Sequence, residues 1–194
     1  MNIRWSPRLR PFLVYIGVNV LLFAASLGNP RNLLPYGVSW GGGALRFFLF
    51  ALERSFLHFG FWHLLMNMGS TFSLGQAFAA VFPARVCNMR YVLGFLFGAS
   101  LFTGVCVQIG DLLNRHYSAG ASGAICALIG FLVAVCLGKT WAARRLNKRG
   151  IIGNAVFIVA MTFLVPGISV VGHMSGLVFG LGAGAWFNVR ERDA

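Results

Sequence analysis

Acidic side chains are the scarcest group in this chain. Only four of its 194 residues are Asp or Glu, charged residues of both signs make up 10%, and hydrophobic residues make up 58%. The mean hydropathy is +0.76. Soluble globular domains carry about 25% charged residues. The composition therefore excludes an ordinary soluble domain and indicates an integral membrane protein.

The positions of the four acidic residues also bear on the class of membrane protein. Glu53 and Asp111 fall near the ends of connecting segments, and Glu191 and Asp193 fall in the C-terminal tail. We expect no Asp, Glu, Lys or Arg inside an apolar helix, and the chain shows no internal repeat. Channels and transporters place ionisable groups inside the membrane or are built from repeats. Neither class is favoured here.

Cysteine is sparse as well, and its spacing is uninformative for metal binding. Cys87, Cys106, Cys126 and Cys136 do not follow the spacing of metal ligands, and three of them fall within apolar segments. A cysteine buried in a membrane is usually a small packing residue. We therefore expect neither a disulfide nor a metal site.

Long apolar runs are what the chain has in abundance. A helix needs about 20 apolar residues to cross a bilayer. The sequence predicts an all-α membrane protein of six transmembrane helices, as a single domain over residues 1–194 with an external loop at 28–57. The first run lacks an Ala-x-Ala-like cleavage site, so we expect it to be retained. The six runs cover residues 11–27, 61–82, 91–110, 122–138, 151–166 and 172–187.

The basic residues indicate the orientation of these helices. Twelve of the 16 Lys and Arg residues lie in alternate connections and in the two tails, whereas four lie in the other connections. The positive-inside rule then predicts six crossings with both termini in the cytoplasm. A nucleic-acid-binding surface would gather on one face of a soluble fold, so no nucleic acid partner is expected. The four exceptions are Arg31, Arg46, Arg54 and Arg115.

Polar residues open three of the predicted helices. His63 and Asn67 lie near the start of the second, Ser122 starts the fourth, and His173 starts the sixth. All three helices run inward, so these side chains reach the same outer depth of the membrane. Residues four apart share a helix face, and a helix N-terminus offers free N–H groups. This set suits a developing oxyanion, although a lone membrane His or Asn is also a common interhelical hydrogen-bonding group.

Small residues form a stripe on each of the two helices that begin with Ser122 and His173. Such stripes let membrane helices approach closely. Packing the stripes together would bring the hydroxyl of Ser122 near the imidazole of His173. The ordinary alternative is that Gly and Ala are common in membrane helices. The stripes are Ser122, Cys126, Gly130, Ala134 and Gly138, and His173, Gly176, Gly180 and Gly184.

A serine needs an adjacent base to act as a nucleophile at neutral pH. In a triad a third group, usually an acid, orients the base. Glu191 and Asp193 fall on the wrong side of the membrane for this role, and Glu53 and Asp111 are expected outside the helices. A dyad of Ser122 and His173 is therefore favoured over a triad that includes Asp111.

Three motifs follow one another along the chain. The segment from His58 to Asn67 has the pattern His-x4-His-x3-Asn, and the second motif is Gly120-Ala121-Ser122-Gly123. The third is His173-Met-Ser-Gly176-x3-Gly180. In this order they resemble the motifs of rhomboid intramembrane serine proteases in their minimal six-helix bacterial form. The resemblance spans the whole chain.

The resemblance implies roles for these residues. Ser122 would attack the scissile carbonyl, with His173 as general base and then acid, and His63, Asn67 and the Ser122 backbone N–H would hold the oxyanion. Gly120 would keep the preceding loop open, and His58 would be structural. Substrates would be transmembrane proteins cut near their outer ends, in a bacterial inner membrane, with no metal or organic cofactor. The oligomeric state stays open.

Two positions depart from the family pattern. Cys126 stands where the family often has an aromatic residue that packs on the catalytic histidine. The external loop lacks a Trp-Arg pair, for which Trp40, Arg46 or Arg54 would substitute, and Gly41-Gly42-Gly43 suggests a flexible element. A related non-cleaving protein that only binds transmembrane helices is the alternative function. Retention of Ser122 and His173 argues against it.

Overall fold

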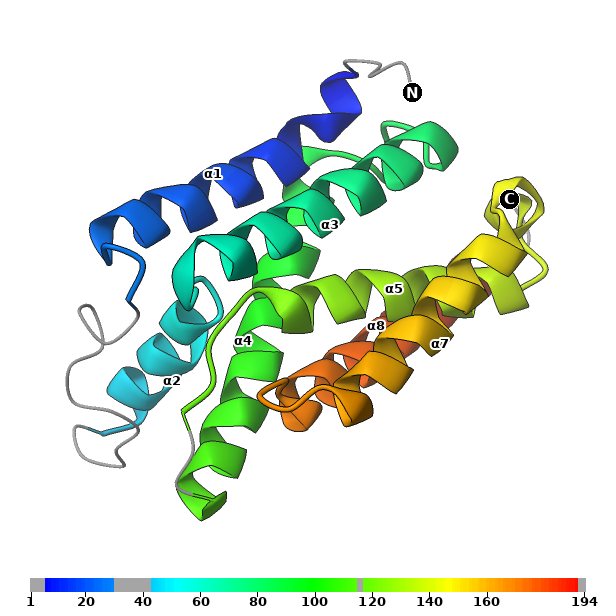
Figure 1. The fold of residues 1–194 in the computed structure, drawn as a ribbon. Coiled ribbons are helices and arrows are strands. Elements are labelled where there is room, and N and C mark those ends of the chain that lie inside the picture. Colours follow the sequence, from blue (N-terminus) through cyan, green and yellow to red (C-terminus); the bar gives the residue numbers. More distant parts are fainter. Residues whose placement is uncertain (1–5, 30–42, 115–116, 192–194) are drawn as a thin grey trace.

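The computed structural model describes residues 6–29, 43–114 and 117–191, which fold into helices joined by short connections (Figure 1). No strand occurs in these ranges. The all-helical class predicted from the apolar runs is therefore confirmed. After a 3-10 turn at Pro7–Leu9, the helices are α1 (Arg10–Ala25), α2 (Gly43–Arg54), α3 (Gly60–Val81), α4 (Met89–Asn114), α5 (Ser122–Leu137), α6 (Trp141–Arg145), α7 (Lys148–Leu164) and α8 (Val170–Arg190).

The six longest apolar runs coincide with α1, α3, α4, α5, α7 and α8, with ends that differ by at most four residues. Two further helices lie in connections. The segment expected as a loop at 28–57 contains α2, because Gly43–Arg54 is free of proline and rich in Leu, Ala and Phe. The short α6 begins where the Thr140 side chain accepts a hydrogen bond from the Ala143 N–H.

Some residues used in the sequence argument lie outside the described residues. They are Arg4, Arg31, Trp40, Gly41, Gly42, Arg115, Arg192 and Asp193.

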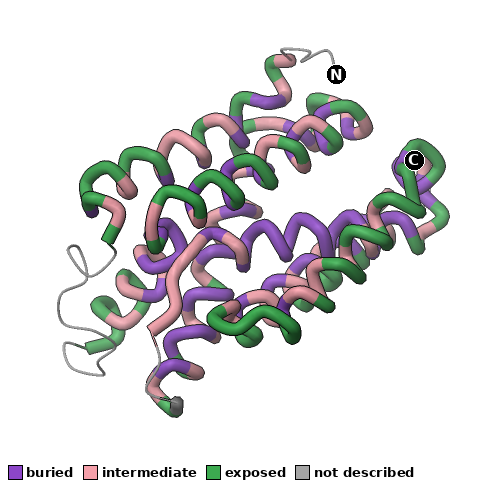
Figure 2. Tube along the Cα trace, in the orientation of Figure 1, coloured by how far each residue is buried: buried purple, intermediate pink, exposed green. Residues whose placement is uncertain are grey.

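Three helices of the described chain are long and apolar enough to cross a membrane: Pro7–Ala25, Met89–Leu113 and Val170–Arg190. The apolar α5 is shorter. It contacts α3, α4, α6, α7 and α8, so it lies at the centre of the molecule. Figure 2 shows α5 almost wholly buried while its neighbours keep exposed faces. The apolar side chains of α5 therefore pack mainly against other helices of the protein.

Glycine contacts hold α8 against α5. A Cβ added at Gly176 would collide with the Gly123 carbonyl oxygen, and one added at Gly180 would collide with the Ala127 carbonyl oxygen. At Gly184 it would lie 2.6 Å from the Phe131 carbonyl oxygen. The backbones of the two helices are therefore in direct contact along the stripe. This confirms the predicted packing of the small-residue faces.

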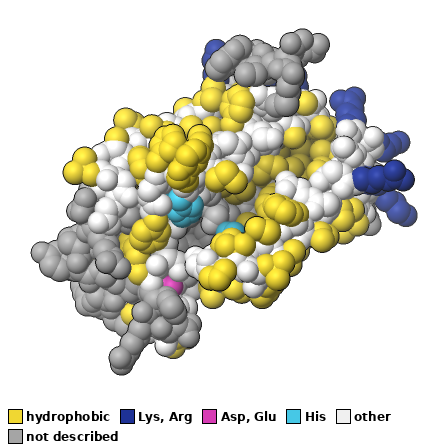
Figure 3. Space-filling view, viewed as in Figure 1, with side chains coloured by type: hydrophobic (Ala, Val, Ile, Leu, Met, Phe, Trp, Pro, Cys, Tyr) yellow, Lys and Arg dark blue, Asp and Glu magenta, His cyan; other side chains and the backbone are white. Residues whose placement is uncertain are grey.

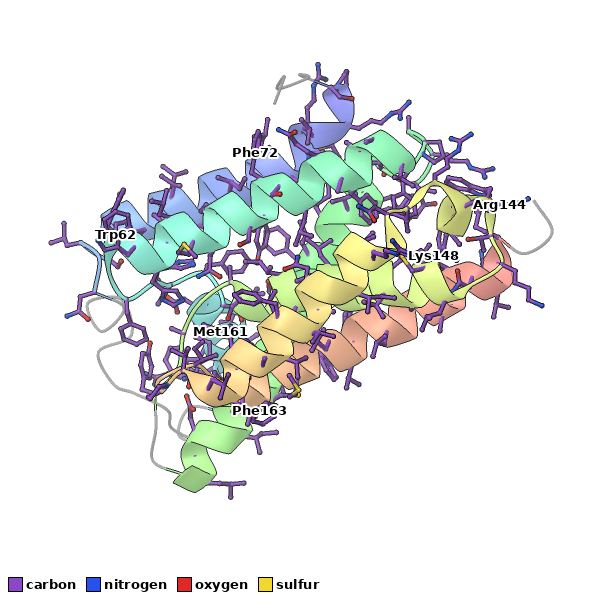
Figure 4. The ribbon with its side chains drawn as sticks, turned by 45° about the vertical axis from the view of Figure 1, so that its right-hand side comes forward. Trp62, Phe72, Arg144, Lys148, Met161 and Phe163 are labelled. Carbon is purple, nitrogen blue, oxygen red and sulfur yellow. The ribbon has the colours of Figure 1, made fainter. Side chains whose placement is uncertain are left out.

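Most of the described basic residues gather at one end of the bundle, and Arg46 and Arg54 of α2 are the exceptions. Figure 4 shows Arg144 and Lys148 at the end opposite Trp62, which lies in the first turn of α3. The start of α1 and the end of α8 lie toward the same end as α6 (Figure 1). The N-terminal ends of α3, α5 and α8 lie at the opposite, less basic end.

Gly180 offers a direct test of this packing. We expect Gly180→Ala to lower the free energy of unfolding by about 3 kcal/mol, since overpacking costs about 1–3 kcal/mol and here the obstacle is rigid backbone. Gly182→Ala on the same helix is the control, because its added Cβ meets nothing within 4 Å. Thermal or denaturant unfolding in detergent micelles measures both. Equal stability of the two variants would contradict the contact.

Candidate active site

The predicted polar residues meet at the less basic end of the bundle. His63 and Asn67 lie in the first two turns of α3, Ser122 begins α5, and His173 lies in the first turn of α8. Figure 3 shows two histidine surfaces on one face of the molecule, surrounded by hydrophobic side chains. Three segments distant in sequence thus deliver hydroxyl, amide and imidazole groups to one end of the fold.

The close contact of α5 with α8 brings Ser122 toward His173. Gly176, one turn after His173, packs on Gly123, the residue that follows the serine. Ser122 and Gly172 also line a common cavity of about 30 Å³. The Ser122 hydroxyl and the His173 ring share no hydrogen bond in this structure. The observed contact therefore brings together the first turns of α5 and α8, on which Ser122 and His173 lie.

His63 presents a hydrogen-bond donor to the loop before the serine. The Phe59 N–H donates to His63 Nδ1 over 3.3 Å, so in the neutral ring the proton is on Nε2. A Cβ added at Gly120 would lie 2.9 Å from both Cε1 and Nε2 of His63. Gly120 also has a φ of 136°, which other residues rarely adopt. Only glycine lets this loop rest against the imidazole.

The side chain of Asn67 makes a hydrogen bond within its own helix. Its side-chain amide donates to the His63 carbonyl oxygen over 2.8 Å, and the residue is 6% exposed. An amide nitrogen carries two protons. The bond to the His63 carbonyl uses one of them.

His58 is a buried residue that packs against His63. It is fully buried, its Nδ1 lies 3.2 Å from the Phe56 carbonyl oxygen, and its ring meets the His63 ring edge-on at 5.0 Å between centroids. Burial, with the neighbouring His63, lowers the pKa of His58 to about 4. The ring is neutral at physiological pH. These contacts agree with the structural role expected for it.

His173 has a hydroxyl partner that the sequence did not reveal. Thr162 Oγ1 on α7 lies 2.8 Å from His173 Nδ1. No aromatic ring of the described residues packs on His173, and Cys126 is buried against Gly176. The only hint in the sequence was a single threonine in an apolar run 11 residues before the histidine.

A buried ion pair anchors the loop that leads to Ser122. Arg54 Nη2 lies 2.6 Å from Asp111 Oδ2, and the two side chains are 3% and 7% exposed. Asp111 also accepts hydrogen bonds from the N–H and the hydroxyl of Ser118. The Arg54 carbonyl oxygen accepts from the Gly120 N–H over 3.0 Å. Asp111 is thus occupied away from His173.

These contacts correct two expectations. Glu53 lies inside α2 and Asp111 inside α4, whereas both were expected outside helices. Helix α4 extends four residues past its predicted end and so includes Asp111, whose buried carboxylate is compensated by the charge of Arg54. Of the candidate anchors, Arg54 takes the role, while Arg46 lies over the Phe50 ring at 5.1 Å within α2.

Comparison with known proteins decides the family. The rhomboid domain model matches residues 42–189, which is most of the chain. This chain belongs to the rhomboid family. It is 30% identical over 135 residues to "Rhomboid-like protease 2" of Toxoplasma gondii, covering 69% of this chain and 45% of that protein. It is 32% identical over 142 residues to "Rhomboid protease GluP" of Bacillus subtilis, covering 71% of this chain and 26% of that protein.

The matched part is less than half the length of these two relatives. Family membership together with the apolar helices makes the chain an integral membrane protein. The rhomboid match begins at residue 42 and so includes α2, the ion pair and all the motif residues.

The ion pair of this rhomboid domain can be tested by charge removal. We expect Asp111→Asn to cost about 3–5 kcal/mol of unfolding free energy, because it leaves the buried Arg54 charge uncompensated. Glu191→Gln is the control: its pair with Arg85 involves a side chain that is 61% exposed, so the cost is about 1 kcal/mol or less. Equal losses in unfolding measurements would contradict the anchoring role.

A substitution at Gly120, compared with one at Gly60, distinguishes the effect of backbone strain from the effect of crowding against His63. We expect Gly120→Ala to lower activity about 100-fold, the scale of a misplacement of about 1 Å near a reacting group. Gly60→Ala is the control, since Gly60 also has a positive φ, 82°, but an added Cβ meets nothing within 4 Å. It should lose about 1–2 kcal/mol of stability and keep its activity. Cleavage rates and unfolding curves of both variants decide the matter.

Proposed function

We propose that this chain is an intramembrane serine protease that cleaves transmembrane proteins by a Ser122–His173 dyad. The observation that carries the proposal is the backbone contact between α5 and α8, which brings the serine at the head of one helix toward the histidine at the head of the other. The names of the two relatives, both proteases, support it. Asp111 is engaged by Arg54, which favours a dyad over a triad with that acid.

The reaction follows from the groups present. Ser122 Oγ attacks the scissile carbonyl carbon while His173 takes the hydroxyl proton. The oxyanion accepts hydrogen bonds from His63 Nε2–H, the free amide proton of Asn67 and the Ser122 backbone N–H. Each such donor is typically worth about 2.7–4 kcal/mol. His173 then protonates the leaving amine, and an acyl-enzyme on Ser122 remains.

Hydrolysis of the acyl-enzyme needs water in a hydrophobic setting. The cavity of about 30 Å³ behind Ser122 is also lined by Ser55, Thr103 and Ser118. A water needs about 10–15 Å³ and two or more polar partners. The cavity fits one or two waters beside the serine.

Substrates enter from the membrane in this proposal. A groove of about 390 Å³ between α3 and α7 is lined by Leu65, Ser70, Asn154 and Ile158, among others. We propose six crossings with both termini in the cytoplasm of a bacterial cell, supported by the gathering of basic residues at the end opposite the site (Figure 4). The cut then falls near the outer end of the substrate helix.

The dyad is tested by labelling with a fluorophosphonate probe and by cleavage of a transmembrane reporter in proteoliposomes. We expect Ser122→Ala and His173→Ala each to abolish both signals. Ser175→Ala is the control: its hydroxyl donates to the Gly172 carbonyl oxygen within α8, and full activity is expected. A folded wild type that neither labels nor cleaves would point to the alternative, a protein that binds transmembrane helices without cutting them.

A further inference from the structure

Among the described residues, the hydroxyl of Thr162 is the one side-chain group that makes a hydrogen bond with the ring of His173. Thr162 is 2% exposed. Its Oγ1 lies 2.8 Å from His173 Nδ1 and 2.7 Å from the carbonyl oxygen of Ile158, one turn earlier in α7. We infer that Thr162 is a positioning residue that holds His173 in the tautomer protonated at Nδ1. This inference rests on the proposed function, because it concerns how the base is prepared.

The assignment follows from counting protons. A threonine hydroxyl has one proton and can accept through its lone pairs. A backbone carbonyl can only accept, so the hydroxyl proton goes to Ile158, as is common for threonine in helices. The oxygen then faces Nδ1 as an acceptor, and Nδ1 carries the ring proton. Nε2 is left as the unprotonated nitrogen, which is the form a general base requires.

The hydrogen bond between His173 and Thr162 becomes stronger once His173 is protonated. Once His173 has taken the proton of Ser122, the ring is a cation and the bond from Nδ1–H to Thr162 becomes charge-assisted. A hydroxyl thus does part of what a carboxylate does in a triad. It does so without placing a second charge inside the bundle, where a charge is costly.

Thr162 also makes the base depend on where α7 sits. Thr162 is the buried residue of α7, whereas Phe157, Phe163 and Leu164 are 61%, 65% and 75% exposed. Figure 4 shows Met161 and Phe163 near the end of α7 that lies away from Arg144. This helix also lines the groove toward α3. A displacement of α7 that opens the groove would take the acceptor from His173 until α7 returned.

The test compares Thr162→Val, which keeps the shape but removes the acceptor, with Thr162→Ser, which retains it. Nitrogen NMR of protein labelled at its histidines reads the tautomer directly, and loss of one signal set in His173→Ala assigns the residue. We expect Nδ1 protonated in the wild type and in Thr162→Ser, and a mixture of tautomers in Thr162→Val. Thr71→Val is the matched control, since Thr71 is buried and bonds only to its own helix.

Kinetics provide the second readout. We expect Thr162→Val to lower kcat about 10- to 100-fold, by analogy with the loss found when the hydrogen-bond partner that orients a metal-binding histidine is removed. KM should change little, because Thr162 is only 2% exposed, and Thr162→Ser should restore kcat. A general loss of packing would lower the unfolding temperature of Thr162→Val and would not be rescued selectively by serine.

Two results would overturn the inference. One is a wild-type His173 protonated at Nε2, which is decisive even if Thr162→Val fails to fold. Another is a Thr162→Val variant with the wild-type tautomer and kcat. Failure of the proposed function is distinct: the folded wild type would then neither label nor cleave, or labelling would survive Ser122→Ala. The NMR result for His173 and Thr162 would still stand or fall by itself.

Discussion

The direct backbone contact between α5 and α8 is the constraint on which the rest of this structure depends. In a membrane the hydrophobic effect does not drive helices together, so association relies on close packing. Three glycines of α8 supply it, at Gly176, Gly180 and Gly184. The α5 stripe begins at Ser122 and the α8 stripe at His173, so the contact that holds the two helices together also brings these two residues toward each other.

Buried polar contacts also hold the loop that leads to Ser122, the proposed nucleophile. The loop before Ser122 is tied to α2 through the Arg54 carbonyl and to α4 through Asp111. The paired charges of Arg54 and Asp111 compensate each other where either alone would be costly. Gly120 completes the arrangement, since its bare backbone can lie against the His63 ring.

The chemistry of the site is prepared by neutral hydrogen bonds. The Phe59 N–H fixes the proton of His63 on Nε2, and the Thr162 hydroxyl faces Nδ1 of His173. In the proposed reaction the two rings have opposite tasks, His63 as a hydrogen-bond donor and His173 as a proton acceptor. Both assignments use hydroxyl or backbone groups, which suits a low-polarity interior where ionised partners are expensive.

The sequence alone determined the helical class, the extent of six apolar helices and the residues that meet at one end of the bundle. These follow from local hydrophobicity and from motifs of fixed spacing. Only the tertiary structure revealed that α2 holds the loop before Ser122, that Asp111 pairs with Arg54 and that Thr162 reaches His173. Such contacts join side chains far apart in the chain, so they depend on how helices are rotated and how deeply they pack. No spacing within one helix encodes that geometry.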